Sequence, residues 1–383
     1  SNSSAASDVY KRQILLLLFF SVMENILSKL SLNNNSNFNG EKYKDVLKIS
    51  YKSDFPIIKT NANDDDNCES EGNKNYSLNV LYTGGIKTYV NNNSNSRGYT
   101  TDIGWGCMIR SSQTLLANTL DILYKQNNTN YDTQNLTEIC KLFKDDYAFP
   151  FSIHNITTLG KTKFDVNIGD WFGPSVASQC IQTILKTSEN KLINELICDC
   201  LVSIDSGTIF EDEVENTILE RDNHNINKES SVLILLCVRL GLEQINEDFY
   251  DFLLTLFDKK FVDKNEKNFN FVGIAGGKPF KSLYFFDVDN ENNLIYSDPH
   301  YVTNYTTIAN DDLELIKTFQ DNKSLSFTNV KELDPSMCIG FTVKNMKGLQ
   351  ALKLLLKDNT IIRFGNKKKE LELLENLNLD DCL

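Results

Sequence analysis

The sequence predicts an α+β fold, in which the main helical patterns precede most of the strand-like runs. Helical patterns begin at residues 107 and 175, and apolar runs typical of strands are concentrated in residues 232–343. Strands and helices therefore do not alternate regularly, which argues against an α/β barrel. Hydrophobic residues make up 41% of the 383 residues, with 23 Phe and 15 Tyr, so the chain has enough apolar material for a large core.

Four helices are expected within residues 41–345. A short one covers residues 41–49. In the helix that begins at Cys107, four apolar residues recur along one face: Ile109, Leu116, Leu120 and Leu123. Pro174 stands at the favoured first-turn position of a helix over 175–186, and a further helix covers 246–257.

The strand-like runs are short and are separated by turn residues. Two pairs of runs form predicted hairpins, 78–82 with 86–90 around Thr-Gly-Gly, and 283–288 with 294–296 around Asp-Asn-Glu-Asn-Asn. Two further apolar strands are expected over 232–240 and 338–343.

Composition divides the chain into three parts: an N-terminal extension over 1–40, a main domain over 41–345, and a C-terminal helix with an acidic tail over 346–383. The extension holds an apolar run over 14–23, which is too short to cross a bilayer and is expected to form a helix packed on the body of the protein or on another copy of the chain. Four stretches rich in Asn are expected to be mobile surface insertions or linkers: 33–40, 61–75, 91–97 and 127–135.

Charge and cysteine content exclude several classes of function. The net charge of −13 is unfavourable for nucleic-acid binding, which needs clustered Lys and Arg. The nine Cys are irregularly spaced and odd in number, which favours reduced thiols and a cytoplasmic protein. Cys198 and Cys200 form the only close pair and have no His at ligand spacing, so neither a metal nor another cofactor is expected.

The chain has only three His, which narrows the search for a catalytic base. His224 lies in a polar stretch, and His154 lies among apolar residues and is expected to be structural. His300 ends the sequence Tyr-Ser-Asp-Pro-His, which follows an apolar strand. Because residues i and i+2 of an extended segment point to the same side, Asp298 and His300 are expected to project together. The carboxylate then fixes the imidazole tautomer and stabilises its cation, although a simple strand-end turn is the competing interpretation.

Cys107 is the candidate nucleophile. It follows Thr-Asp-Ile-Gly-Trp-Gly, so Gly104 and Gly106 allow a tight turn before the helix. A helix N-terminus lowers the pKa of a thiol, and its backbone N–H groups can bind an oxyanion. A buried Cys at the start of an ordinary amphipathic helix is the alternative, but the presence of Asp298 and His300 favours a thiol nucleophile.

These motifs resemble those of the autophagins, the autophagy-related cysteine proteases, over roughly residues 41–345. The motifs that carry the resemblance occur in the same order: Thr101-Asp102-Ile103-Gly104-Trp105-Gly106-Cys107-Met108-Ile109-Arg110, Ser152-Ile153-His154, Gly169-Asp170-Trp171-Phe172-Gly173-Pro174, Arg239-Leu240-Gly241-Leu242, Gly273-Ile274-Ala275-Gly276-Gly277-Lys278-Pro279, Asp298-Pro299-His300 and Leu333-Asp334-Pro335-Ser336.

The resemblance implies that the main domain, residues 41–345, has a papain-like fold with a small accessory subdomain. It implies a thiol endopeptidase that uses no cofactor and cleaves after the C-terminal Gly of an autophagy-related ubiquitin-like protein. It also implies that the enzyme removes the same protein from phosphatidylethanolamine, and touches membranes only peripherally, through this lipidated substrate. An inactive papain-like binding module and a deubiquitinase-like acyl hydrolase are the alternatives.

Two aromatic positions complete the comparison with the autophagins. The family places an oxyanion-binding Tyr in a pattern of Tyr, three residues, Phe and Pro. Tyr51 with Phe55 and Pro56 matches it, and a core Tyr is the alternative. The family also has a Trp that covers the nucleophile, expected upstream of Ser152. The only two Trp of the chain, Trp105 and Trp171, belong to other motifs and are expected in the core or in a cleft wall. Either Tyr131 or Tyr147 is therefore expected to replace the covering Trp, or the cover is looser.

Overall fold

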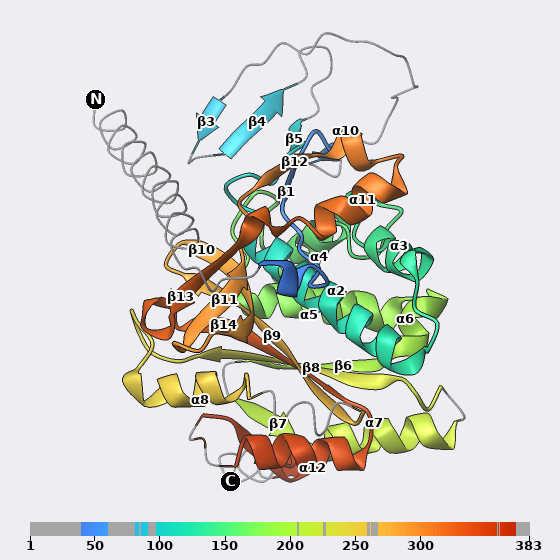
Figure 1. Cartoon of the computed structure of the whole chain (residues 1–383), viewed down its shortest axis with the longest axis vertical. Helices are drawn as coiled ribbons and strands as arrows, with labels where there is room; N and C mark the ends of the chain where they lie inside the picture. Colours follow the sequence, from blue (N-terminus) through green and yellow to red (C-terminus); the bar gives the residue numbers. More distant parts are fainter. Residues whose placement is uncertain are drawn as a thin grey trace, which may run out of the picture.

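A computed structural model describes residues 40–59, 81–83, 86–90, 97–204, 207–224, 227–258, 261, 267–357, 359 and 361–372. Its centre is a seven-stranded sheet in the order β13-β11-β10-β9-β14-β8-β6 (Figure 1). These strands are β13 (Leu325–Asn329), β11 (Asn293–Ser297), β10 (Lys281–Val288), β9 (Phe269–Lys278), β14 (Ser336–Val343), β8 (Ser231–Arg239) and β6 (Ile197–Ile204). The β6–β8 pair is parallel, and the other neighbours are antiparallel.

Helices cover both faces of this sheet (Figure 1). On one face α2 (Cys107–Asn127) packs on β9 and β10, and α5 (Pro174–Thr187) packs on β6, β8 and β14. On the other face lie α7 (Glu211–Asn223), against β6 and β8, and α12 (Met346–Leu355), against β9 and β14. Central strands therefore bury both faces, which is why β8 appears in the sequence as a continuous apolar run.

Shorter elements surround this body. The remaining helices and 3-10 turns are η1 (Gly40–Tyr43), α3 (Thr133–Lys141), α4 (Ile153–Phe164), α6 (Lys191–Leu196), η2 (Glu247–Phe249), α8 (Tyr250–Thr255), α10 (Tyr305–Ile308), α11 (Asp312–Phe319), η3 (Asn322–Ser324) and η4 (Val330–Glu332). A smaller sheet has the order β2-β5-β4-β3, and two strand pairs are β1 with β12 and β7 with β15. These strands are β1 (Tyr51–Ser53), β2 (Ile58–Lys59), β3 (Leu81–Thr83), β4 (Ile86–Val90), β5 (Arg97–Tyr99), β7 (Thr208–Phe210), β12 (Val302–Asn304) and β15 (Arg363–Gly365).

The α+β prediction is confirmed, together with the main elements that were expected. Helices begin at Cys107 and Pro174, the region 246–257 forms η2 and α8, and both hairpins form, as β3–β4 and β10–β11. The four apolar residues chosen for the inner face of α2 are all buried.

The predicted helix over 41–49 is wrong beyond its first turn. Only η1 is helical, and residues 47–50 have no regular secondary structure. Tertiary hydrogen bonds replace the helical ones there: the backbone of Leu47 bonds the Asn118 amide through both its N–H and its C=O, and the Ile49 N–H donates to Thr114. The polar side chains of α2 therefore hold this segment extended across the helix.

The interpretation of 127–135 as a mobile insertion is also wrong in part. α2 continues to Asn127, and α3 begins at Thr133. Asp132 and Asn135 form a reciprocal capping box, in which each side chain accepts from the other residue's backbone N–H. The apolar run 14–23 and nearly all of the other three Asn-rich stretches lie outside the described residues.

Candidate active site

The loop before α2 wraps around the side chain of Asp102 and leads to Cys107. The N–H groups of Trp105 and Gly106 both donate to the Asp102 carbonyl, at 3.2 and 2.9 Å. Gly104 has φ +88, and a Cβ on Gly106 would lie 2.7 Å from the Asp102 carboxylate. Both glycines predicted from the sequence are therefore required by this turn, which brings Cys107 to the first position of the helix.

Asp298 and His300 lie together at the end of β11, as predicted, although a turn rather than an extended segment joins them. Asp298 Oδ1 lies 2.5 Å from His300 Nδ1 and also accepts from the backbone N–H of His300 at 3.0 Å. The carboxylate is buried, whereas the His300 side chain is 22% exposed. This geometry places the proton of the imidazole on Nδ1, so that Nε2 is the atom available for proton exchange.

Tyr51 lies beside His300, although the two residues are far apart in the sequence. Its strand β1 pairs in parallel with β12, which follows His300, and the Tyr51 N–H donates to the Pro299 carbonyl at 2.8 Å. The Tyr51 ring stands edge-on to the His300 ring, with centroids 5.1 Å apart. The structure therefore brings together all four predicted site residues: Tyr51, Cys107, Asp298 and His300.

Several donors surround the Cys107 sulfur. Burial is the largest influence on its pKa and acts to raise it, but three hydrogen bonds and the His300 charge lower the pKa of the thiol overall. The donors are the His300 imidazole, the backbone N–H of Ser282 and the Tyr51 hydroxyl. Burial and the charge of Cys107 raise the pKa of Tyr51 well above its usual value, so its hydroxyl keeps the proton it donates.

The pKa of His300 is raised and the pKa of Asp298 is lowered relative to their usual values. Burial acts to lower the pKa of His300, but the Asp298 charge and hydrogen bond raise it to about 9. Burial acts to raise the pKa of Asp298, but His300 and Lys281 hold it well below its usual range. The site therefore favours a thiolate, an imidazolium and a carboxylate more strongly than isolated side chains would, and this is the charge state of an activated thiol nucleophile.

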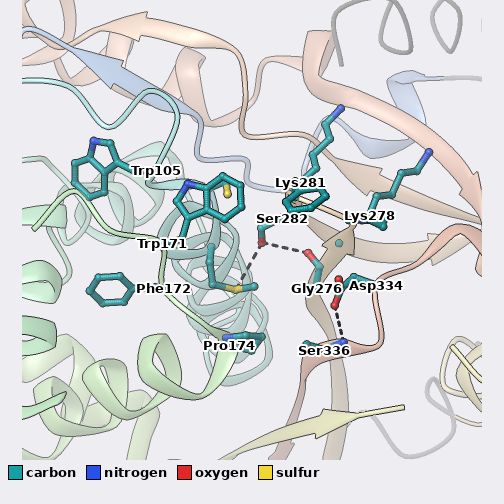
Figure 2. Close-up of a pocket in the computed structure, with 15 residues that line it drawn as sticks. Trp105, Trp171, Phe172, Pro174, Gly276, Lys278, Lys281, Ser282, Asp334 and Ser336 are labelled. Atoms are coloured by element: carbon teal, nitrogen blue, oxygen red, sulfur yellow. Dashed lines mark hydrogen bonds between the residues drawn. The ribbon is translucent and has the colours of Figure 1, made fainter. Parts of the chain in front are cut away.

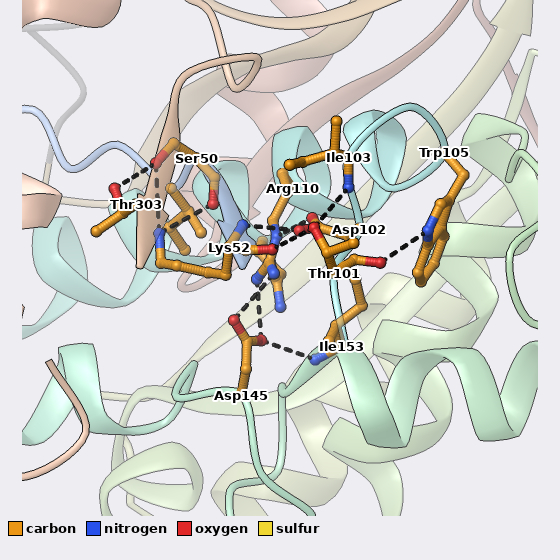
Figure 3. A network of polar contacts seen from close by, with 12 residues as sticks. Ser50, Lys52, Thr101, Asp102, Ile103, Trp105, Arg110, Asp145, Ile153 and Thr303 are labelled. Carbon is orange, nitrogen blue, oxygen red and sulfur yellow. Dashed lines mark hydrogen bonds and ion pairs between the residues drawn. The ribbon is translucent and has the colours of Figure 1, made fainter. Parts of the chain in front are cut away.

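A buried ionic network beneath the site joins the segments that carry these residues (Figure 3). Arg110, one turn after Cys107, pairs with Asp102 at 2.6 Å and with Asp145 at 2.9 Å, and its side chain has 0% exposure. Asp102 also accepts from the backbone N–H of Lys52 at 2.7 Å, and Asp145 accepts from the N–H of Ile153 at 3.3 Å. The network thereby fixes the Tyr51 strand, the loop before Cys107 and the start of α4 relative to one another.

A pocket of about 270 Å³ opens beside Cys107 (Figure 2). Gly276 and Gly277 of β9 line it together with Trp105, Trp171 and Phe280. Trp171 is 54% exposed, its indole N–H donates to the Gly104 carbonyl at 2.7 Å, and its ring centroid lies 6.1 Å from that of Phe280. Two large aromatic side chains, Trp171 and Phe280, therefore form part of the pocket wall beside the sulfur.

The proposed replacements for a covering Trp are wrong. Tyr131 bonds Asp121 on α2, more than three helical turns from Cys107, and Tyr147 packs against His154. Trp171 instead lines the wall of the pocket. A cleft wall was one of the two locations, with the core, that the sequence predicted for the Trp residues. The motif of Trp171, Gly-Asp-Trp-Phe-Gly-Pro, was the signal available in the sequence, but the distance along the chain concealed its contact with Gly104.

The other two His are remote from the thiol. His154 is buried, its Nε2 lies 2.6 Å from the Pro56 carbonyl, and burial lowers its pKa. His224 is exposed and ends α7. The structural interpretation of His154 therefore agrees with its position.

The fold and this constellation of thiolate, imidazolium and carboxylate define a cysteine protease of the papain-like class. The model of the peptidase C54 catalytic domain matches residues 36–354, and the chain belongs to this family.

Curated relatives agree with this assignment. The chain is 30% identical over 364 residues to a probable cysteine protease ATG4 of Kluyveromyces lactis, covering 94% of this chain and 74% of the relative. It is 32% identical over 358 residues to the cysteine protease ATG4 of Saccharomyces cerevisiae strain S288c, covering 91% of this chain and 65% of the relative. For the cysteine protease ATG4 of Candida albicans the identity is 35% over 270 residues, covering 70% of this chain and 54% of the relative.

Two features are absent from the described residues, a membrane-spanning helix and a cluster of metal ligands. Among these residues, no helix combines the length and apolar character needed to cross a bilayer. Within the same ranges, no group of three or more His, Cys, Asp or Glu is arranged to hold a metal ion.

Proposed function

We propose that this cysteine protease cleaves after the C-terminal Gly of an autophagy-related ubiquitin-like protein, both in its precursor and in its conjugate with phosphatidylethanolamine. The relatives are named for autophagy, which supports this class of substrate. The observation that carries the proposal is the pocket lined by glycines and aromatic side chains beside the Cys107 thiol, whose pKa is lowered. The proposed setting is the cytoplasm, with membrane contact only through the lipidated substrate.

The roles of the four residues follow from their positions. The Cys107 thiolate attacks the carbonyl carbon of the scissile Gly and forms a C–S bond, and the carbonyl oxygen becomes an oxyanion. The Tyr51 hydroxyl, which already donates to the sulfur, is adjacent to that oxyanion and can donate to it, as can the N–H of Cys107. Asp298 keeps the imidazolium oriented throughout.

Collapse of this intermediate breaks the C–N bond. His300 gives its proton to the leaving nitrogen, which departs as an amine, and the acyl group remains on Cys107 as a thioester. Water then attacks the thioester, with His300 as the base, and releases the carboxylate product and the thiol. The leaving nitrogen belongs to a peptide in the precursor and to ethanolamine in the conjugate, so one acyl site serves both substrates.

The pocket supports selection for Gly by exclusion of larger residues. We expect the site to be too narrow for residues larger than Gly, because its lining combines two large aromatic side chains, Trp171 and Phe280, with the backbone of Gly276 and Gly277.

The test uses a ubiquitin-like precursor that extends beyond its Gly, and the same protein joined to phosphatidylethanolamine in liposomes. Mass spectrometry should show cleavage after Gly in both by the wild-type protein, and none with Cys107→Ala, which keeps the fold. Substrates with Ala or Val in place of Gly should show kcat/KM values that fall steeply with side-chain volume. Binding without cleavage supports an inactive binding module instead, and equal cleavage of the Gly and Val substrates contradicts the narrow site.

A further inference from the structure

Lys281 contacts the catalytic carboxylate from a turn that lines the pocket. It is the first residue of β10, and its Nζ lies 3.0 Å from Asp298 Oδ2, with the two side chains only 9% and 3% exposed. His300 uses the other oxygen, Oδ1. The carboxylate thus lies between two cationic groups that approach it from different elements.

The same turn carries a second lysine, Lys278, which contacts a different carboxylate. Lys278 also lines the pocket, but its Nζ pairs with Glu332 at 2.7 Å, and that carboxylate is 55% exposed. Lys278 therefore serves as a matched control for the effect of the Lys281 charge on the site. Both add a positive charge to one turn, and Lys281 is the one that places it against the Asp298 carboxylate in a water-poor environment.

The charge of Lys281 lies against Asp298 and lowers the pKa of that carboxyl, and through it we expect an effect on the other two groups of the site. Asp298 is faced by His300 and Lys281, and His300 by Asp298 and Cys107. Cys107 is faced by His300, by the Tyr51 hydroxyl and by the N–H of Ser282, the residue next to Lys281. A nearby positive charge disfavours every added proton, so it favours the thiolate at low pH and the loss of the imidazolium proton at high pH.

We propose that Lys281 is a positioning residue of the protease site, which holds Asp298 against His300 and sets the pH range in which the pair of Cys107 thiolate and His300 imidazolium persists. This inference rests on the proposed roles of these residues. It goes beyond them because it adds a fourth charged side chain, Lys281, to the thiol, the imidazole and the carboxylate.

The test compares Lys281→Met and Lys281→Gln, which remove the charge, with Lys281→Arg, which keeps it, and with Lys278→Met as the matched control. The first measurement is the rate of alkylation by iodoacetamide against pH, which reports the thiolate without any substrate. The second is the pH profile of kcat/KM with the ubiquitin-like precursor. Thermal unfolding of each variant identifies folded preparations, and the Gln variant serves if the Met variant does not fold.

Loss of the Lys281 charge should move the acid limb of both profiles and the alkaline limb of the kcat/KM profile to higher pH, by on the order of half a pH unit. The Cys107 thiolate loses an attractive neighbour, and the His300 imidazolium loses a repulsive one. The Arg variant should keep the wild-type limbs, and so should Lys278→Met. Unmoved limbs with a lower plateau would assign Lys281 to packing alone, and an equal shift in Lys278→Met would show a general effect of charge on the turn. If the wild-type protein does not cleave the precursor, the proposed substrate fails, whereas the alkylation profile still decides the role of Lys281.

Discussion

The buried network under Cys107 predicts a large and pH-dependent loss of stability when its central cation is removed. In Arg110→Met, the carboxylates of Asp102 and Asp145 stay buried but lose the guanidinium that neutralises them, and the side chains involved are at most 2% exposed. Removal of one partner of a buried ion pair costs about 3–5 kcal/mol. At about 2 °C per kcal/mol for a large domain, the melting temperature should fall by roughly 6–10 °C.

The sign of the pH dependence separates this effect from lost packing. Without Arg110, burial raises the pKa of both carboxyls in the folded protein above their unfolded values. The folded variant then binds protons more tightly than the unfolded chain, so its deficit relative to wild type shrinks as the pH falls from ~7.5 to ~5.5. Differential scanning calorimetry at several pH values measures this deficit.

A second buried arginine supplies the control. Arg221 is 3% exposed, but it pairs with Asp222, whose carboxylate is 42% exposed, and donates to the carbonyls of Ser230 and Lys344. Arg221→Met should therefore show a deficit that does not shrink on acidification. Adding Asp102→Asn and Asp145→Asn to Arg110→Met should restore part of the lost stability. A deficit in Arg110→Met that is the same at every pH would refute the assignment to uncompensated carboxylates.

Four further outcomes are expected. Iodoacetamide should label Cys107 before Cys140 at neutral pH, because burial raises the pKa of Cys140 while the pKa of Cys107 is lowered; equal labelling by peptide mass mapping contradicts this. The kcat/KM of the wild-type protein should decline as the pH rises through about 9, where His300 loses the proton it delivers; a decline at the ordinary pKa of imidazole would contradict the raised value. Tyr51→Phe should lower kcat on the order of 100- to 1,000-fold through loss of an oxyanion donor, and a change below about threefold would assign Tyr51 to packing. Trp171→Ala should widen the site and raise the relative kcat/KM for a Val substrate over the Gly substrate on the order of tenfold; an unchanged ratio would place the size filter elsewhere.

Short-range patterns in the sequence were enough to predict the kind of chemistry that this protein carries out. A Cys after two glycines at the start of an amphipathic helix is a short-range pattern, and so is an Asp two residues before a His. Both pairs of features lie within a few residues, so propensity and spacing were enough to select Cys107, Asp298 and His300 as candidates, and the structure places these three side chains together. The same local rule failed at residues 41–49, where hydrogen bonds from Asn118 and Thr114 override helix propensity.

Only the tertiary structure decided which distant segments complete the site. Sequence spacing carries no information about contacts between elements far apart in the chain, so it could not show that Trp171 reaches the carbonyl of Gly104 or that Arg110 lies between Asp102 and Asp145. Nor could it distinguish Lys281 from Lys278, two similar residues of one turn. Lys281 belongs to β10, which pairs with β11 just before Asp298, whereas Lys278 belongs to β9, and this placement decides which lysine meets the Asp298 carboxylate.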